Sequence, residues 1–311
     1  MSMVVIGTAF VDIKGFPEDT YLPTGRNAGS VEYVHGGVAR NVVEDIANAE
    51  LRPIYLGIVD DTPMGQGVLE KLKRHKVNTD YVAVEPDGMG LWLAIFDHHG
   101  DLAGSISKRP RADAILKTLQ EKGDEIFARA DSVVLQVDLQ KEIVKKVFEL
   151  AQQYHTKLFA LVSNMSIAAE RRDFLKKFDC FICNQEEAGI LFLDDYSGKT
   201  PAEMEQILAD RVVRAAIPAM VVTMGAQGAV YADRQGVRGY IPARRVQVKD
   251  TTGAGDAFCA GTAIGMTYGK TLAEAVEIGT MLAASVITSS ENVCPRFEPR
   301  ELGLAVKPEG F

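Results

Sequence analysis

The chain has little cysteine, a single tryptophan and no long apolar run. Its 311 residues include only four cysteines, which favours a reducing compartment, so we expect a cytoplasmic protein. A short apolar run near the start is interrupted by Asp12, so neither a signal peptide nor a membrane span is predicted. Lys and Arg number 34 against 42 Asp and Glu, a net charge of −8, and no basic block occurs. Nucleic acid and anionic membranes are therefore not expected partners.

Apolar runs alternate along the chain with longer amphipathic stretches. Six runs are typical of strands buried on both faces: Met3–Gly7, Pro53–Ile58, Ser132–Gln136, Thr156–Val162, Phe178–Cys183 and Ala219–Thr223. Seven stretches carry apolar residues at helical spacing: Arg40–Ala49, Met64–His75, Ile115–Ala128, Lys141–Tyr154, Pro201–Ala216, Asp256–Tyr268 and Leu272–Ile287. The alternation predicts an α/β fold with a mostly parallel, covered sheet, as one domain over residues 1–311.

Two segments, about 13–35 and 88–108, break this alternation. In the second, Leu91–Phe96 and Leu102–Ser107 flank a turn that contains Gly100, which predicts a β-hairpin. We expect the two segments together to form a small β lid inserted in the main domain.

The segment Lys249–Phe258 carries the strongest chemical signal. It reads KDTTGAGDAF, follows a β-type run at Arg245–Val248 and opens an apolar helix. Its two glycines lack the Cβ atoms that would block an anion, and the free N–H groups at the start of the helix would face that anion. A carboxylate at this place, Asp256, suits the removal of a proton from a hydroxyl that attacks phosphorus. The alternative is an ordinary helix cap after a glycine turn.

A second glycine pair, Gly36 and Gly37, precedes a helix and is followed by Asn41. The missing side chains would let the backbone touch a substrate, and the amide of Asn41 offers both a donor and an acceptor to sugar hydroxyls. A simple turn before a helix is the alternative.

The glycine pair near the start of the chain and the glycine-rich segment near its end resemble the two signatures of the PfkB/ribokinase family of sugar and nucleoside kinases. DTTGAGD at residues 250–256 matches D-T-x-G-A-G-D, and GGVARN at residues 36–41 matches G-G-x-x-x-N. The resemblance implies a ribokinase-like three-layer α/β/α fold with a β lid and an ATP-dependent transfer of phosphate to a primary hydroxyl. It implies Asp256 as the catalytic base, an anion hole formed by Gly253, Ala254, Gly255 and Asp256, and an acceptor site formed by Asp12, Gly36, Gly37 and Asn41.

Further matches extend the resemblance over nearly the whole chain. Asn184 and Glu187 match N-x-x-E, and Thr223, Gly225 and Gly228 match T-x-G-x-x-G. By resemblance, Glu187 positions Mg²⁺ through water. The implied nucleotide contacts are Asn184, Glu187, Thr223, Gly225, Gly228, Thr252 and Thr280, and the carbonyls of Asp250 and Thr252 would hold a monovalent cation such as K⁺. Taken alone, the two matches could be a solvated loop and a hairpin turn.

The motifs say less about which molecule accepts the phosphate than about the type of reaction. GGVARN at residues 36–41, preceded by Asn27-Ala28-Gly29, looks most like the G-G-V-G/A-R-N motif of the pseudouridine-kinase branch. The family resemblance also implies a homodimer. Where many members have Asp-Pro after the strand Thr156–Leu161, this chain reads Leu161-Val162-Ser163-Asn164, and Cys183 stands where a Lys often precedes the N-x-x-E motif. These departures leave a non-catalytic ligand-binding or regulatory protein as the alternative. Trp92 in the expected lid could serve in packing or as a platform for a base, and His35 could reach a substrate.

Overall fold

A nine-stranded sheet forms the centre of the computed structural model, which describes residues 1–305. The last part of the predicted domain, residues 306–311, lies outside the described residues. The strand order is β13-β12-β11-β10-β9-β8-β1-β4-β5. The strands are β1 (Met3–Ile6), β4 (Ile54–Val59), β5 (Asn78–Val84), β8 (Ser132–Gln136), β9 (Lys157–Leu161), β10 (Cys180–Asn184), β11 (Ala219–Thr223), β12 (Ala229–Asp233) and β13 (Arg238–Ile241).

The strands from β5 to β11 pair in parallel, and only β12 and β13 run antiparallel to their neighbours. The six predicted strands all lie in the parallel part, because buried parallel strands are the ones that read as continuous apolar runs. The expected β-type run Arg245–Val248 is wrong: these residues form no strand. Val246 and Val248 are exposed there, at 39% and 56%, so burial does not favour a strand at this place.

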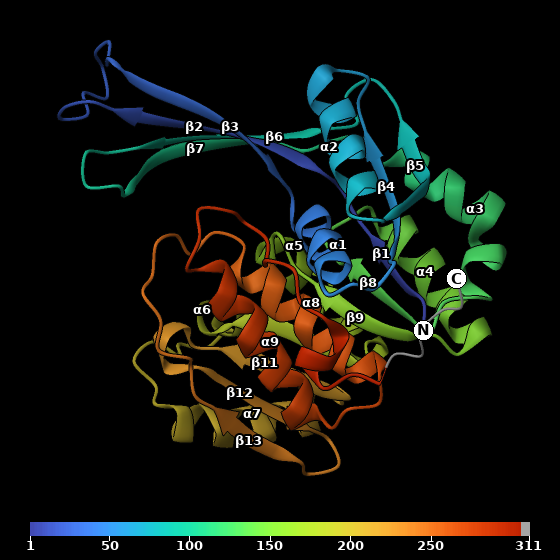
Figure 1. The fold of residues 1–311 in the computed structure, drawn as a ribbon. Helices are drawn as coiled ribbons and strands as arrows, with labels where there is room; N and C mark the ends of the chain where they lie inside the picture. Colours follow the sequence, from blue (N-terminus) through green and yellow to red (C-terminus); the bar gives the residue numbers. More distant parts are fainter. Residues whose placement is uncertain (306–311) are drawn as a thin grey trace.

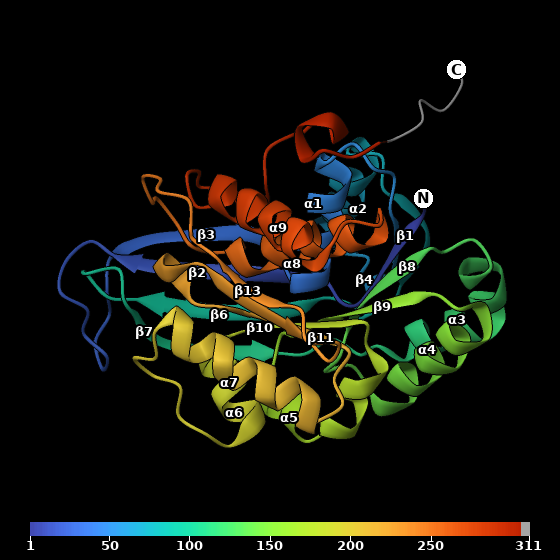
Figure 2. The ribbon, with the colours of Figure 1, turned by 90° about the horizontal axis from the view of Figure 1, so that it is seen from below.

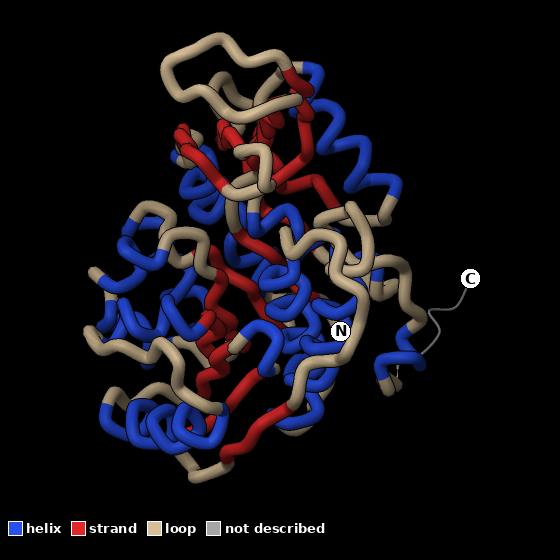
Figure 3. The backbone as a smooth tube through the Cα atoms, turned by 90° about the vertical axis from the view of Figure 1, so that its left-hand side faces the viewer, coloured by secondary structure: helices blue, strands red, loops and turns tan. Residues whose placement is uncertain are grey.

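Helices cover both faces of the sheet (Figures 1 and 2). One layer contains α1 (Val38–Asn48), α2 (Pro63–Arg74), α8 (Ala254–Thr267) and α9 (Leu272–Val286). The other contains α3 (Asp113–Phe127), α4 (Lys141–Tyr154), α5 (Met165–Ala169), α6 (Gln185–Phe192) and α7 (Pro201–Arg214). Figure 3 shows the strands between the two sets of helices. The three-layer α/β/α fold is confirmed.

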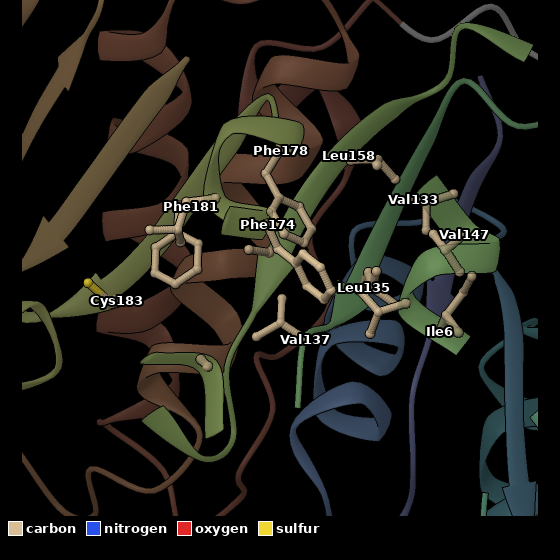
Figure 4. Packing of buried hydrophobic residues seen from close by; sticks show 14 of the residues in the cluster. Ile6, Val133, Leu135, Val137, Val147, Leu158, Phe174, Phe178, Phe181 and Cys183 are labelled. Atoms are coloured by element: carbon tan, nitrogen blue, oxygen red, sulfur yellow. The ribbon is translucent and has the colours of Figure 1, made fainter. Parts of the chain in front are cut away.

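Each face of the sheet has its own apolar core. Figure 4 shows part of the core on the α3–α7 side, where Phe178 packs edge-on against Phe181 at 6.5 Å between ring centroids. Cys183 belongs to this core, whereas Cys180 belongs to the core on the opposite face. Residues three apart in a strand diverge in this way, so the C-x-x-C spacing is a packing pattern.

A separate four-stranded sheet extends beyond the main body (Figure 1). Its order is β3-β2-β6-β7, from β2 (Phe10–Pro17), β3 (Gly29–Gly36), β6 (Gly90–Phe96) and β7 (Leu102–Lys108). The predicted hairpin is present, with Gly100 at a φ of 85° in its turn. This small sheet fits the expected lid. Among residues 1–305, no helix is both long and apolar enough to cross a bilayer.

Candidate active site

The N-terminus of α8 is built around a residue that must be glycine. Gly253 caps the helix with a φ of 82°, in the left-handed region that other residues avoid. A Cβ atom there would lie 2.0 Å from the carbonyl oxygen of Asn292. Helix α8 then starts at Ala254, whose N–H donates to the Thr251 carbonyl at 3.2 Å. Gly255 and Asp256 follow in the first turn, where a helix provides no acceptor for the N–H groups, so these two groups suit an anion cradle.

Asp256 is held by a side chain from α1. The amide nitrogen Nδ2 of Asn41 donates to Oδ2 of Asp256 at 2.6 Å. Burial raises the pKa of Asp256 from 3.8 to about 7, against the lowering effects of Asn41 and Arg40 and with further raising by Asp12 and Glu187. A carboxylate with a pKa near neutrality is suited to accept a proton from a hydroxyl. The other atom of the Asn41 amide, Oδ1, is buried and has no hydrogen-bond partner among the described residues.

Asp12 and Gly36 meet on one face of the small sheet, and Gly37 follows directly after Gly36. Strand pairing places Phe10 opposite Gly36 and Asp12 opposite Val34, so all four positions share a face. A Cβ atom on Gly36 would lie 2.4 Å from both carboxylate oxygens of Asp12. Gly37, at a φ of 95°, is the N-cap of α1, and Asn41 lies one turn further along this helix. Burial raises the pKa of Asp12, although Lys14 and Arg40 oppose this.

The two further motifs meet at one edge of the large sheet. Asn184 and Thr223 are partners at the ends of the parallel strands β10 and β11. Both line an open cleft of about 950 Å³ together with Glu186 and Gly225. Gly228 has a φ of 101°, and a Cβ atom there would lie 2.1 Å from the carbonyl oxygen of Ile241.

Asn184 and Glu187 also form a capping box at the start of α6. The Asn184 side chain accepts from the Glu187 N–H, and Oε2 of Glu187 accepts from the Asn184 N–H, both at 2.8 Å. The expected loop is therefore wrong, because these residues begin a helix, although Asn184 and Glu186 are exposed to solvent. Helix α6 itself was not predicted, although the N-x-x-E spacing is a signal for a capping box.

The other residues predicted to contact the nucleotide or the cation, Asp250, Thr252 and Thr280, form local hydrogen bonds. Oδ1 of Asp250 accepts from the Thr252 N–H at 2.9 Å and from its hydroxyl at 2.8 Å, which fixes the turn before the anion cradle. Thr280 is buried in α9, and its hydroxyl donates to the Val276 carbonyl at 2.9 Å. The roles predicted for these three residues stay predictions.

Trp92 lies beside Asp12, whereas His35 turns away from it. Trp92 is the partner of Asp12 on the adjacent strand β6, so its half-buried indole shares the Asp12 face. His35 is paired with Val11 on the opposite face, and its Nε2 approaches Gly67 of α2. The idea that the His35 side chain could reach a substrate is therefore wrong, since strand alternation points it the other way.

Two residues outside the predicted set, Asp138 and Arg40, have contacts that the sequence analysis did not predict. Asp138, just after β8, accepts from the hydroxyl of Ser163 at 2.7 Å, so a carboxylate from the neighbouring strand lies where the chain lacks the usual Asp after β9. Arg40 is 1% exposed and lies within α1. An arginine inside an apolar helix face was the available signal.

A groove of about 1000 Å³ lies elsewhere, between α1, α2 and the chain after α9. It is lined by residues such as Lys71, His75 and Cys294 and by none of the predicted site residues. The candidate active site is instead the place where the predicted residues come together, at Asp12 and Gly36 of the small sheet and at the N-termini of α1 and α8, which the Asn41–Asp256 bond joins.

Residues 1–294 match the model of the pfkB family of carbohydrate kinases. The chain belongs to this family. Guanosine-inosine kinase from Exiguobacterium acetylicum is 34% identical, covering 93% of this chain and 95% of the relative. Pseudouridine kinase from Escherichia coli is 24% identical, covering 88% of this chain and 86% of the relative.

The fold of this pfkB-family kinase is also that of solved ribokinases. The structure of Arabidopsis thaliana ribokinase complexed with ribose and ATP superposes with a TM-score of 0.82 at 19% identity, covering 96% of this chain and 97% of that one. The family and the kinase class expected from the motifs are confirmed.

Proposed function

We propose that this pfkB-family kinase transfers the γ-phosphoryl group of ATP to the 5′ hydroxyl of a ribonucleoside. The observation that carries the proposal is Asp256, a carboxylate whose pKa is raised to about 7, in the first turn of α8 and 2.6 Å from Asn41. The cradle of N–H groups at Gly253–Asp256 stabilises the negative charge that develops on the transferred phosphate. Asp256 takes the proton of the attacking hydroxyl.

The acceptor half of the site supports a sugar with free hydroxyls. The carboxylate of Asp12 can accept from two neighbouring hydroxyls, and the absent side chain of Gly36 leaves room beside it. The unpartnered Oδ1 of Asn41 can accept a third hydroxyl hydrogen bond. A buried acceptor without a partner is costly in the free protein, and an acceptor hydroxyl would relieve that cost.

The nucleoside class is supported by two independent observations. Two relatives are named for nucleoside acceptors, guanosine-inosine kinase and pseudouridine kinase. In addition, Trp92 lies next to Asp12 on the same face, where its indole is available to stack on a planar base attached to the sugar. We propose purine ribonucleosides and pseudouridine as the first acceptors to test.

We propose that ATP binds at the edge formed by β10 and β11, where Asn184, Thr223, Gly225 and Gly228 would lie near its phosphates. Thr252 and Thr280 are the further nucleotide contacts that we propose. Glu187 fits an indirect role toward Mg²⁺: its capping bond uses Oε2, and the second oxygen can hold a water of a hydrated ion. Bound Mg²⁺ would neutralise charge on the phosphates. We propose that the carbonyls of Asp250 and Thr252, in the turn that the Asp250 side chain holds, bind K⁺ as an activator.

We also propose a cytoplasmic homodimer. The four cysteines are all free and buried, in keeping with a reducing compartment. Tyr33, Leu93 and Ile106 form an apolar row on the face of the small sheet opposite to Asp12, and are 63%, 39% and 70% exposed. This row and the fully exposed edge strand β7 suit pairing with a second copy of the chain.

The experiment is coupled ADP release with Mg-ATP and KCl over guanosine, inosine, adenosine, pseudouridine, uridine and ribose. Asp256→Asn is the matched control, because it keeps the shape and the hydrogen bond from Asn41. We expect nucleoside-dependent ADP release that the variant lacks. Because Trp92 is the only tryptophan, its fluorescence reports nucleoside binding directly. Bound ATP and nucleoside without ADP release from the wild type would instead support a non-catalytic protein.

A further inference from the structure

Arg40 joins segments that are far apart in the sequence and meet behind the active site. Its side chain is 1% exposed, and Nη1 donates to Oε2 of Glu44 at 2.6 Å. Nε donates to the Gly36 carbonyl at 3.4 Å, and Nη2 donates to the His35 carbonyl. Nη2 also donates to Oδ1 of Asn292 at 3.1 Å. One guanidinium group thus bonds to the end of β3, to α1 and to the loop after α9.

Asn292 completes the connection to the anion cradle. Its Nδ2 donates to the same His35 carbonyl at 2.9 Å, so Arg40 and Asn292 share an acceptor. The backbone carbonyl of Asn292 lies against Gly253, where even a Cβ atom would not fit. A continuous set of contacts therefore runs from Gly36, at the acceptor site, to Gly253, at the phosphate site. Helices α1 and α8, which begin at these two sites, pack against each other (Figure 2).

We propose that Arg40 and Asn292 form a clamp that fixes the distance and orientation between the acceptor glycines and the anion cradle. The inference rests on the proposed phosphoryl transfer. Arg40 is a positioning residue in this proposal: it bonds to the backbone that bears the site and to Asn292. In-line transfer needs the hydroxyl and the phosphorus held at a fixed approach, and a displacement of about 1 Å can cost about 100-fold in rate.

The first test is a double-mutant cycle on transfer kinetics. Asn292→Leu removes both Asn292 side-chain bonds while the buried Arg40–Glu44 pair stays intact. We expect a fall in kcat of about tenfold or more, with the KM for ATP within about twofold of the wild type. Because the two residues act as one unit, the double variant Arg40→Met/Asn292→Leu should have a kcat close to that of Arg40→Met alone. Additive losses would overturn the clamp.

A matched set of variants separates positioning from stability. Arg40→Met alone leaves the buried Glu44 without its closest cation and should lower the melting temperature, whereas Arg40→Met with Glu44→Met removes the buried pair together. Arg40→Lys keeps a cation for Glu44 and should recover stability, but one ammonium group lacks the planar fork and should not recover kcat. Full recovery of kcat in Arg40→Lys, or in the stable double variant, would refute the role in positioning.

A second readout does not depend on activity. Amide hydrogen exchange in Asn292→Leu should accelerate in two distant segments, residues 35–38 and 290–294. Asn48→Leu is the control, because the Asn48 amide bonds to the Cys294 carbonyl at 2.6 Å and not to His35. It should loosen only the second segment. Faster exchange confined to one segment in Asn292→Leu would refute the clamp. A wild type without kinase activity would refute the proposed function, but the exchange result would still show whether Asn292 connects the two segments.

Discussion

Replacing Asp256 by Asn should inactivate the kinase and at the same time stabilise its folded state at neutral to alkaline pH. Burial raises the pKa of Asp256 from 3.8 to about 7, so the native state holds this proton more tightly than the unfolded chain. As the pH rises above about 4, the unfolded chain ionises first, and the native state loses stability until the pH passes about 7. Asn cannot ionise, so the variant does not incur this loss.

The size of the effect follows from the pKa difference. One pKa unit corresponds to about 1.4 kcal/mol, so the rise from 3.8 to about 7 costs the wild type about 4 kcal/mol above pH 7. Roughly a third of this cost is already present at about pH 5. The advantage of the variant should therefore grow by about 3 kcal/mol between about pH 5 and about pH 8. The hydrogen bond from Asn41 Nδ2 can persist, since the new side chain retains an oxygen acceptor.

The assay is urea unfolding of wild type and Asp256→Asn without ligands at both pH values, followed by fluorescence of Trp92. A general base contributes about 100-fold or more to the rate of such a reaction. The kcat of Asp256→Asn should therefore fall by at least this factor. A stability difference that stays constant with pH would refute the buried, proton-binding state of Asp256. Normal kcat would refute its role as the base.

Three further predictions concern the rest of the site. The value of kcat/KM should rise with pH to a plateau above about 7, as Asp256 ionises among Asn41, Arg40, Asp12 and Glu187; a flat profile from pH 5 to 9 would contradict a base at this position. In Gly36→Ala the new methyl group would meet the Asp12 carboxylate at 2.4 Å, so the KM for the nucleoside should rise about tenfold or more while the KM for ATP is unchanged; equal changes in both would contradict the separate acceptor site. Ile106→Lys, on the exposed face of the small sheet, should convert a dimer to a monomer in light scattering; a wild-type monomer at high concentration would contradict the proposed pairing.

The sequence predicted the parts of this fold that depend on burial. Strands such as Ser132–Gln136 are buried on both faces and read as continuous apolar runs. Strand β5 is only partly buried, and the antiparallel strand β13 is short with alternating exposure, so neither produces such a run. Helix α6 was missed because eight residues give too little periodicity, while its capping box was interpreted only as a nucleotide motif.

The site was predictable where glycines and carboxylates follow the ends of elements. Gly37, Gly253 and Asp256 lie at helix starts, and local sequence is enough to indicate this. The Arg40–Asn292 bond joins residues 252 positions apart, and the proximity of Trp92 to Asp12 depends on strand register. Such contacts follow from the tertiary arrangement, which no local pattern in one sequence encodes.

In the proposed mechanism, Asp256 activates the primary hydroxyl of a ribonucleoside toward the γ-phosphate of ATP. Mass spectrometry and phosphorus NMR of the products formed from Mg-ATP and guanosine, inosine or pseudouridine test it most directly. We expect one nucleoside 5′-monophosphate for each ADP with at least one of these acceptors, and none with Asp256→Asn. Phosphate on a ring hydroxyl, ADP formed with inorganic phosphate alone, or undiminished product from the variant would contradict it.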